Sequence, residues 1–193
     1  MRRIAVLISG NGSNLQALID TIEAGDLGVE IGVVVASRGD AFGLERATRA
    51  GIPVEVMSLS DPADRDLFDA ELAAVVAAYE PDLVVLAGWM LILGAGFLDR
   101  FPNNVINLHP AMPGAFPGTK AIERAHTAFH LGEIKRTGVM VHQVVAEVDA
   151  GPVIVLEPVP IFRGESVEDL EERVHEVEHN LIVAAVDLLL GDS

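Results

Sequence analysis

One stretch of the sequence decides the fold, because it passes abruptly from an apolar run into a glycine-rich turn: Ile4-Ala5-Val6-Leu7-Ile8-Ser9-Gly10-Asn11-Gly12-Ser13-Asn14-Leu15. The five apolar residues at 4–8 predict a strand that is buried on both faces. The turn that follows predicts a helix N-terminus, with Ser13 or Asn14 as the cap and the helix running to about Ala24. A buried strand that leads directly into a helix favours an α/β domain.

Apolar runs and amphipathic stretches continue to alternate along the rest of the chain. Further strands are expected at 31–36, 54–57, 83–87, 105–108, 138–145 and 153–160, and further helices at 41–50, 61–79, 119–131 and 166–190. Ser166 and Asp169 suit a capping box at the start of the last helix. This order predicts a Rossmann-like, mostly parallel twisted sheet with helices on both faces. No repeat or break in composition divides the chain, so residues 1–193 are expected to form a single domain.

The composition argues against several classes of protein. With 13 basic and 29 acidic residues the net charge is −16, which disfavours a nucleic-acid partner. The absence of cysteine excludes disulfides, a thiol nucleophile and cysteine-ligated metal sites. The longest uncharged run, 83–98, is shorter than the ~18 residues of a spanning helix, and the apolar run after Arg3 is too short for a signal peptide. We therefore expect a cytoplasmic protein with no membrane partner, which binds any anionic ligand through local groups.

The glycine-rich turn at 10–15 predicts an anion-binding site. Backbone amides at a helix N-terminus, together with the positive end of the helix dipole, attract negative charge. A dinucleotide fingerprint would need Gly or Ala at the position of Leu15, so the phosphate of a small metabolite fits better than a nicotinamide cofactor. The alternative is a tight strand–helix turn with a capping serine and no ligand.

Polar residues gather where the strand expected at 105–108 ends. Asn107 and His109 are two residues apart and should point the same way, outside the carboxyl end of a strand, where open α/β sheets bind ligands. An amide beside an imidazole suits oxyanion stabilisation and proton transfer at an acyl carbon. If Asp149 approaches His109, its charge should raise the pKa of the imidazole. The alternatives are a histidine satisfied by backbone and an aspartate that merely forms the turn before Gly151-Pro152.

A zinc-like pattern, His175-Glu176-Val177-Glu178-His179, falls on the last expected helix. A catalytic zinc also needs a third protein ligand, and only Asp187 and Asp192 follow as candidates. Asp187 lies two turns beyond His179 on the same helix, too far away to complete a site. We therefore do not expect zinc, and a solvated helix face is the simpler interpretation.

Five segments, in this order and at this spacing, resemble the folate-dependent glycinamide ribonucleotide formyltransferases of purine synthesis. They are VLISGNGSNLQALID (6–20), DAFGLERA (40–47), PDLVVLAGWMLIL (81–93), INLHP (106–110) and VDAGPVI (148–154). The resemblance spans nearly the whole chain. It implies one formyltransferase domain over 1–193, with a phosphate-binding half at about 1–100 and a folate-binding, catalytic half at about 101–193.

The resemblance also implies a reaction that needs no metal. The amine of glycinamide ribonucleotide would take the formyl group of 10-formyltetrahydrofolate, leaving formylglycinamide ribonucleotide and tetrahydrofolate. Asn107 would hold the developing oxyanion, His109 would donate a proton, and Asp149 would keep His109 protonated. Both partners of the protein would be small molecules, and the protein would be a monomer or a homodimer.

The resemblance assigns the binding residues as well. The ribonucleotide phosphate would meet Gly12, Ser13 and Asn14, and its glycinamide amine would meet Glu178. The residues implied at the folate are Arg65, Met90, Leu91, Ile92, Leu93, Asn107, Val145, Ala146, Glu147, Val148 and Asp149.

Three other functions compete with this one. A formyltetrahydrofolate deformylase hydrolyses the same donor with a similar Asn/His/Asp trio, but usually has a regulatory domain ahead of the first strand. Methionyl-tRNA formyltransferase shares the core and adds an RNA-binding domain, which the chain length and charge of −16 disfavour. A non-catalytic module that binds a phosphorylated metabolite is the third alternative.

Overall fold

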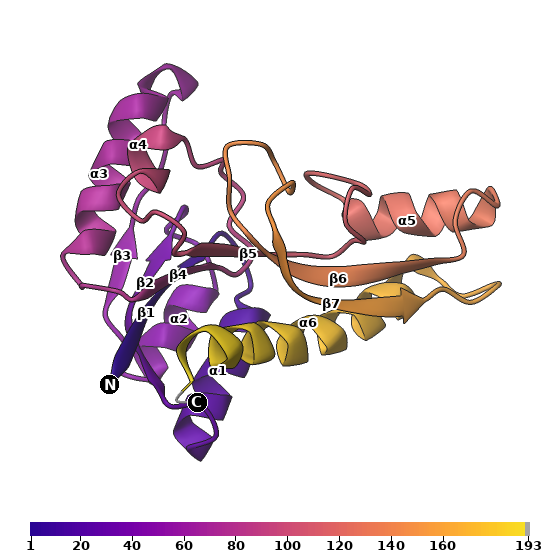
Figure 1. The fold of residues 1–193 in the computed structure, drawn as a ribbon, viewed down its shortest axis with the longest axis horizontal. Coiled ribbons are helices and arrows are strands. Elements are labelled where there is room, and N and C mark those ends of the chain that lie inside the picture. The colour runs from indigo at the N-terminus through magenta and orange to yellow at the C-terminus, as the bar shows by residue number, and fades with distance from the viewer. Residues whose placement is uncertain (192–193) are drawn as a thin grey trace.

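A computed structural model describes residues 1–191 and shows a seven-stranded sheet with helices on both faces (Figure 1). The strand order is β3-β2-β1-β4-β5-β6-β7. The elements are β1 (Arg2–Ile8), α1 (Ser13–Ala24), β2 (Val29–Ala36), α2 (Gly43–Arg49), β3 (Val54–Val56), the 3-10 turn η1 (Pro62–Asp64), α3 (Arg65–Ala77), β4 (Leu83–Leu86), α4 (Ala95–Leu98), β5 (Val105–His109), α5 (Ala121–His130), β6 (Arg136–Gln143), β7 (Val153–Pro160) and α6 (Val167–Leu190). The predicted Rossmann-like fold is confirmed. No helix within residues 1–191 is both long and apolar enough to cross a membrane.

Five of the seven strands are parallel, as the sequence predicts. Strands β1 to β5 pair in parallel, whereas β6 runs antiparallel to both β5 and β7. The segment 144–152 between β6 and β7 contains no helix. A parallel connection would need a longer crossover, so this short segment fits an antiparallel pair.

The apolar run in β1 is uninterrupted because its two faces belong to two cores. Ile4, Val6 and Ile8 pack with residues of α1 and α6, while Ala5 and Leu7 pack with residues of α3. Side chains alternate between the faces of a strand, so both faces must be apolar when helices cover both. Since β1 pairs with both β2 and β4, the turn after it lies at the carboxyl edge of the sheet, among the central parallel strands.

Three local features differ from the sequence predictions. Helix α4 (Ala95–Leu98) was not expected, and the charged helix expected from residue 61 begins as the 3-10 turn η1. The strand expected at 138–145 lies at Arg136–Gln143, so 144 and 145 belong to a longer loop. A Cβ at Gly151 would lie 1.7 Å from the Gln143 carbonyl oxygen, so only glycine lets this loop pack on the end of β6.

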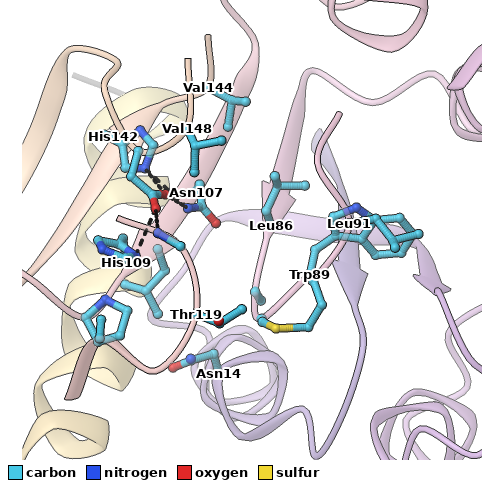
Figure 2. A pocket seen from close by; sticks show the side chains of 18 of the residues that line it. Asn14, Leu86, Trp89, Leu91, Asn107, His109, Thr119, His142, Val144 and Val148 are labelled. Carbon is cyan, nitrogen blue, oxygen red and sulfur yellow. Dashed lines mark hydrogen bonds and ion pairs between the residues drawn. The ribbon is translucent and has the colours of Figure 1, made fainter. Parts of the chain in front are cut away.

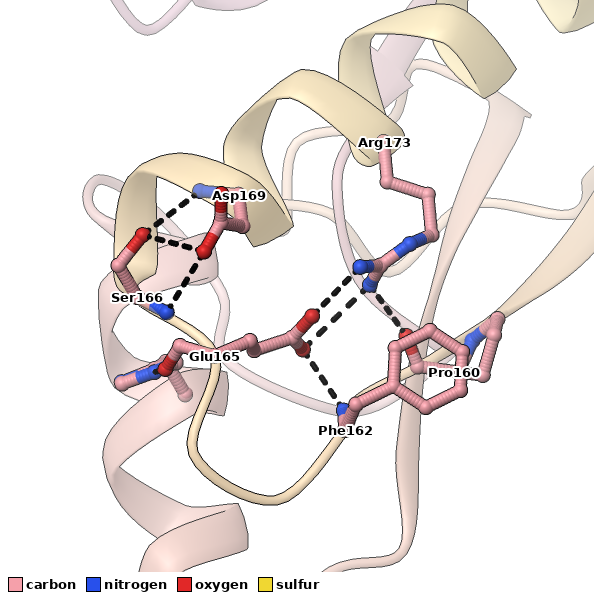
Figure 3. A network of polar contacts seen from close by, with 7 residues as sticks. Pro160, Phe162, Glu165, Ser166, Asp169 and Arg173 are labelled. Carbon is pink, nitrogen blue, oxygen red and sulfur yellow. Dashed lines mark hydrogen bonds and ion pairs between the residues drawn. The ribbon is translucent and has the colours of Figure 1, made fainter.

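The start of α6 is capped as predicted (Figure 3). The Ser166 hydroxyl accepts a hydrogen bond from the Asp169 N–H at 3.1 Å, and the Asp169 carboxylate accepts one from the Ser166 N–H at 3.0 Å. Each satisfies a backbone donor that the helix itself leaves unpaired.

A second set of contacts ties the first turns of α6 to the end of β7 (Figure 3). The Arg173 guanidinium pairs with the Glu165 carboxylate, donates to the Pro160 carbonyl at 2.8 Å and lies 4.6 Å from the centre of the Phe162 ring. The Glu165 carboxylate also accepts the Phe162 N–H at 2.8 Å. These contacts fix the direction of α6, and with it the position of residues farther along that helix.

Replacing Ser166 by alanine should lower the free energy of unfolding by about 1 kcal/mol, because the Asp169 N–H at the helix start loses its hydrogen-bond acceptor. Chemical denaturation of Ser166→Ala measures this loss. Ser60→Ala, at an exposed loop serine, is the control and should leave the free energy unchanged. Equal stability of the two variants would show that the cap contributes nothing.

Candidate active site

A cavity of about 810 Å³ opens at the carboxyl ends of the central parallel strands (Figure 2). Every site residue predicted from the sequence lines it except Arg65. The lining includes Gly12, Ser13 and Asn14 after β1, Met90, Leu91, Ile92 and Leu93 after β4, Asn107 and His109 on β5, Val145, Ala146, Glu147, Val148 and Asp149 after β6, and Glu178 on α6. The cavity thus brings together segments from both halves of the chain.

The Asp149 carboxylate is the centre of the polar cluster in this cavity, and its partners Asn107, His109 and His142 are labelled in Figure 2. Its Oδ2 accepts the Gly118 N–H at 2.8 Å and lies 3.4 Å from His109 Nδ1. Its Oδ1 accepts from Asn107 Nδ2 at 3.1 Å and lies 3.4 Å from His142 Nε2. Asp149 has a φ of 53°, a left-handed conformation that costs a non-glycine residue about 1–3 kcal/mol. The surrounding contacts hold the residue in this conformation.

Asp149 is ionised at neutral pH. Burial alone would raise its pKa, but its contacts with His142 and the Gly118 N–H, together with the nearby imidazoles of His109 and His142, bring the pKa below the usual value. The Asp149 carboxylate therefore provides a negative charge next to Asn107 and His109 at the end of β5.

His109 differs from its expected protonation state. Burial lowers the pKa of its imidazole, and this effect outweighs the attraction of Asp149 and the contact of Nε2 with the Phe116 carbonyl at 3.2 Å. Asp149 raises the pKa of His109, as predicted, but in the free protein burial lowers it by more. Because an ordinary histidine titrates near ~6.5, His109 is mainly neutral at pH 7.

His142 also belongs to the cluster, although it was not among the residues predicted from the sequence. It lies directly opposite Asn107 in the antiparallel register of β5 and β6, and only 2% of it is exposed. Its Nε2 is 3.2 Å from Asn107 Nδ2, and its Nδ1 is 2.9 Å from the Gln143 carbonyl oxygen. A proton on Nδ1 satisfies that carbonyl and leaves Nε2 to accept from Asn107. A histidine directly after the apolar run Val139–Val141 was the available signal, but its partner is known only once the strands are paired.

The Asn107 amide is fully engaged in this arrangement. Its nitrogen contacts both Asp149 Oδ1 and His142 Nε2, and an amide nitrogen has two hydrogens to donate. A donor for a substrate oxygen becomes available only when one of these contacts opens. Catalytic hydrogen bonds often reach their working geometry only with substrate bound.

A second polar pair lies at the other end of the cavity, between α1 and α6. Asn14 Nδ2 donates to Glu178 Oε2 at 3.3 Å, while Asn14 Oδ1 is buried without a hydrogen-bond partner. Burial raises the pKa of Glu178, against the attraction of His175 and the hydrogen bond from Asn14. A buried carboxyl beside an unpaired amide oxygen is a receptor for N–H donors, because an unsatisfied buried acceptor costs free energy until a ligand fills it.

Comparison with known proteins fits this geometry. The sequence pattern of the formyl transferase family matches residues 2–186, nearly the whole chain. This chain belongs to the formyl transferase family. It is 48% identical to phosphoribosylglycinamide formyltransferase of Dictyostelium discoideum, covering 96% of this chain and 97% of that protein. It is 46% identical to the enzyme of that name from Schizosaccharomyces pombe, covering 98% of each.

A solved structure supports the same family. Glycinamide ribonucleotide transformylase 1 from Symbiobacterium toebii superposes with a TM-score of 0.90 at 43% identity, covering 98% of this chain and 87% of that one. The resemblance expected from the five sequence segments is thereby confirmed. The alternatives of a deformylase and of a non-catalytic binding module find no support in these comparisons.

Arg65 has a different environment from the other predicted folate residues of this formyl transferase. Its Nη1 donates to the Ile92 carbonyl, and its side chain is not part of the cavity lining. One turn farther along α3, the buried Asp69 carboxylate accepts the Gly94 N–H at 2.8 Å. In the free protein Arg65 therefore holds the loop after β4, and any contact with folate stays a prediction.

The residues of the zinc-like pattern on α6 are divided between the cavity and its surroundings in this formyl transferase. His175 and Glu178 line the cavity, whereas His179 lies outside the lining with a buried, unpartnered Nε2. Within residues 1–191 no three His, Asp or Glu side chains converge as metal ligands. The buried Glu178 instead faces Asn14.

Replacing Asp149 by asparagine should lower the pKa of His109 further, because Asp149 supplies the largest effect that opposes burial. An NMR titration of the imidazole, assigned with His109→Gln, measures this pKa. The wild-type midpoint should lie below about 6.5, and that of Asp149→Asn lower still. Glu147→Gln removes an exposed carboxylate from the same loop and should leave the midpoint in place. A higher midpoint in Asp149→Asn would contradict this electrostatic account.

Proposed function

We propose that this formyl transferase passes the formyl group of 10-formyltetrahydrofolate to the amine of N1-(5-phosphoribosyl)glycinamide. One observation carries the proposal: a single cavity joins an anion-binding turn, a buried carboxyl for an N–H donor and an Asn/His/Asp cluster. The relatives with 46–48% identity are named for this reaction. We place the reaction in the cytoplasm, between two small-molecule substrates. That the protein is a monomer or a homodimer stays a prediction.

The turn after β1 would bind the phosphate of the ribonucleotide. Gly12 has a φ of 74°, and a Cβ there would lie 2.8 Å from Gly43 Cα, so the backbone turns sharply and closely into α1. The amides of Gly12, Ser13 and Asn14 then stand at the positive end of a 12-residue helix. From this anchor the glycinamide amine would reach Asn14 Oδ1 and Glu178.

The formyl donor would occupy the other side of the cavity. The loop after β4, Met90–Leu93, and the loop Val145–Asp149 line that side. Asn107 lies between the two and would face the formyl oxygen. Attack by the neutral amine forms a C–N bond and moves the carbonyl electron pair onto that oxygen. Holding this oxyanion would require Asn107 to release one of its present contacts, and one such donor contributes ~3–4 kcal/mol to catalysis.

His109 would transfer the proton that the reaction must move. The attacking nitrogen loses a proton, and the folate nitrogen must gain one before the C–N bond to the formyl carbon breaks. His109 is neutral in the free protein, and negative charge developing beside it would raise the pKa of its imidazole. Its two ring nitrogens already face Asp149 and the Phe116 carbonyl, so a protonated ring would be fully hydrogen bonded. It can thus accept the proton from the amine and return it to the folate nitrogen.

The proposed reaction is tested by following 10-formyltetrahydrofolate spectroscopically, with and without the ribonucleotide. We expect consumption only when the ribonucleotide is present. Asn107→Ala should reduce turnover by about a hundredfold or more while the protein keeps its circular dichroism spectrum. Equal consumption without the ribonucleotide would identify a hydrolase and overturn the proposal.

Glu178→Gln tests the proposed amine site. Loss of the buried carboxylate should raise KM for the ribonucleotide by about tenfold or more, since a hydrogen bond to a charged group contributes ~1.5–3 kcal/mol. KM for the folate should stay within about twofold. Glu176→Gln is the matched control, because Glu176 is exposed on the same helix. If only KM for the folate changed, Glu178 would contact the folate and the proposed amine site would be wrong.

A further inference from the structure

Arg46 lies behind the proposed phosphate-binding turn without being part of the cavity lining. It is on α2, and its guanidinium makes three hydrogen bonds to the segment that contains this turn. Nε donates to the Asn11 carbonyl at 2.9 Å, Nη2 to Asn11 Oδ1 at 2.9 Å and Nη1 to Gln16 Oε1 at 3.1 Å. Asn11 precedes the amides of 12–14, and Gln16 follows them on α1. One side chain therefore fixes the turn on both sides.

The backbone of α2 packs on the same turn. The Gly43 N–H donates to the Gly10 carbonyl at 3.1 Å, and the close approach of Gly12 to Gly43 leaves no space for a Cβ. Helix α2 is thus the support against which the turn is folded. Arg46 is the side chain that connects this support to α1.

Arg46 also brings a positive charge with no acidic partner. Among residues 1–191 no carboxylate oxygen lies within 4.0 Å of its guanidinium, whereas Arg49 on the same helix pairs with Glu45 at 2.9 Å. All its hydrogen bonds go to neutral oxygens. In a chain of net charge −16, an unneutralised cation beside a set of amide donors favours a bound anion.

We propose that Arg46 is a positioning residue for the phosphate of the ribonucleotide. Its guanidinium donors hold Asn11 and Gln16 so that the backbone amides of 12–14 converge on one phosphate. Its positive charge adds to their attraction for that phosphate. The planar fork is essential, because lysine offers a single point charge and cannot make all three contacts. This inference rests on the proposed function, in which that turn binds the phosphate.

Arg46→Met tests the inference with Arg49→Met as the matched control. Both arginines lie over the ring of Phe42, at 4.9 and 5.8 Å from its centre, but only Arg46 contacts the turn. Calorimetric titration with the ribonucleotide alone gives Kd, and steady-state kinetics gives KM for each substrate. We expect Kd and KM for the ribonucleotide to rise about tenfold in Arg46→Met, which is about 1.4 kcal/mol, with the folate KM within about twofold. Arg49→Met should match the wild type in all of these.

Arg46→Lys keeps the positive charge but not the guanidinium contacts, so it separates the positioning effect from the charge effect. It also tests the inference if Arg46→Met fails to fold. We expect Arg46→Lys to weaken ribonucleotide binding by at least about threefold, because most of the fork contacts are lost. Wild-type affinity in either Arg46 variant, or an equal loss for both substrates, would overturn the positioning role. Absence of ribonucleotide binding in the wild-type protein would instead overturn the proposed function and this inference with it.

Discussion

One buried carboxylate, that of Asp149, organises the site. It is in a left-handed conformation within loop 144–152, and it accepts hydrogen bonds from the Gly118 N–H and the Asn107 amide. These bonds connect two loops that are distant in sequence to the end of β5. Burial opposes the charge, and the hydrogen bonds and the two neighbouring histidines stabilise it. The arrangement of His109, His142 and Asn107 follows from this one group, since each lies within 3.4 Å of it.

The same constraint explains why the site can respond to substrate. Without substrate, the His109 imidazole is neutral and both hydrogens of the Asn107 amide nitrogen are hydrogen bonded within the protein. A formyl oxygen that gains negative charge would change this balance by attracting a donor from Asn107 and a proton to His109. At the other end of the cavity, α2 packs against the turn after β1, so the proposed phosphate site and the Asp149 cluster are held by separate parts of the fold.

Much of this could be predicted from the sequence, because its strongest signals are local. The run 4–8 and the turn after it predicted β1 and α1, and the two-residue spacing of Asn107 and His109 placed both in one cavity. The features that were missed depend on contacts between distant segments. His142 faces Asn107 only through strand pairing, and Arg65 turns to the loop after β4 because of how α3 packs. The pKa of His109 depends on both burial and charge: Asp149 raises it, as its proximity predicted, but the lowering by burial is larger and could not be judged without the fold.

Hydrogen exchange in Asp149→Ala tests the central role of this carboxylate most directly, because exchange reports local opening residue by residue. If Asp149 holds the two loops, amides in 112–118 and 144–152 should exchange about tenfold faster than in the wild type, while those of β1 keep their protection. Unchanged exchange in both loops would contradict the account, since it would show that they are held in place without Asp149.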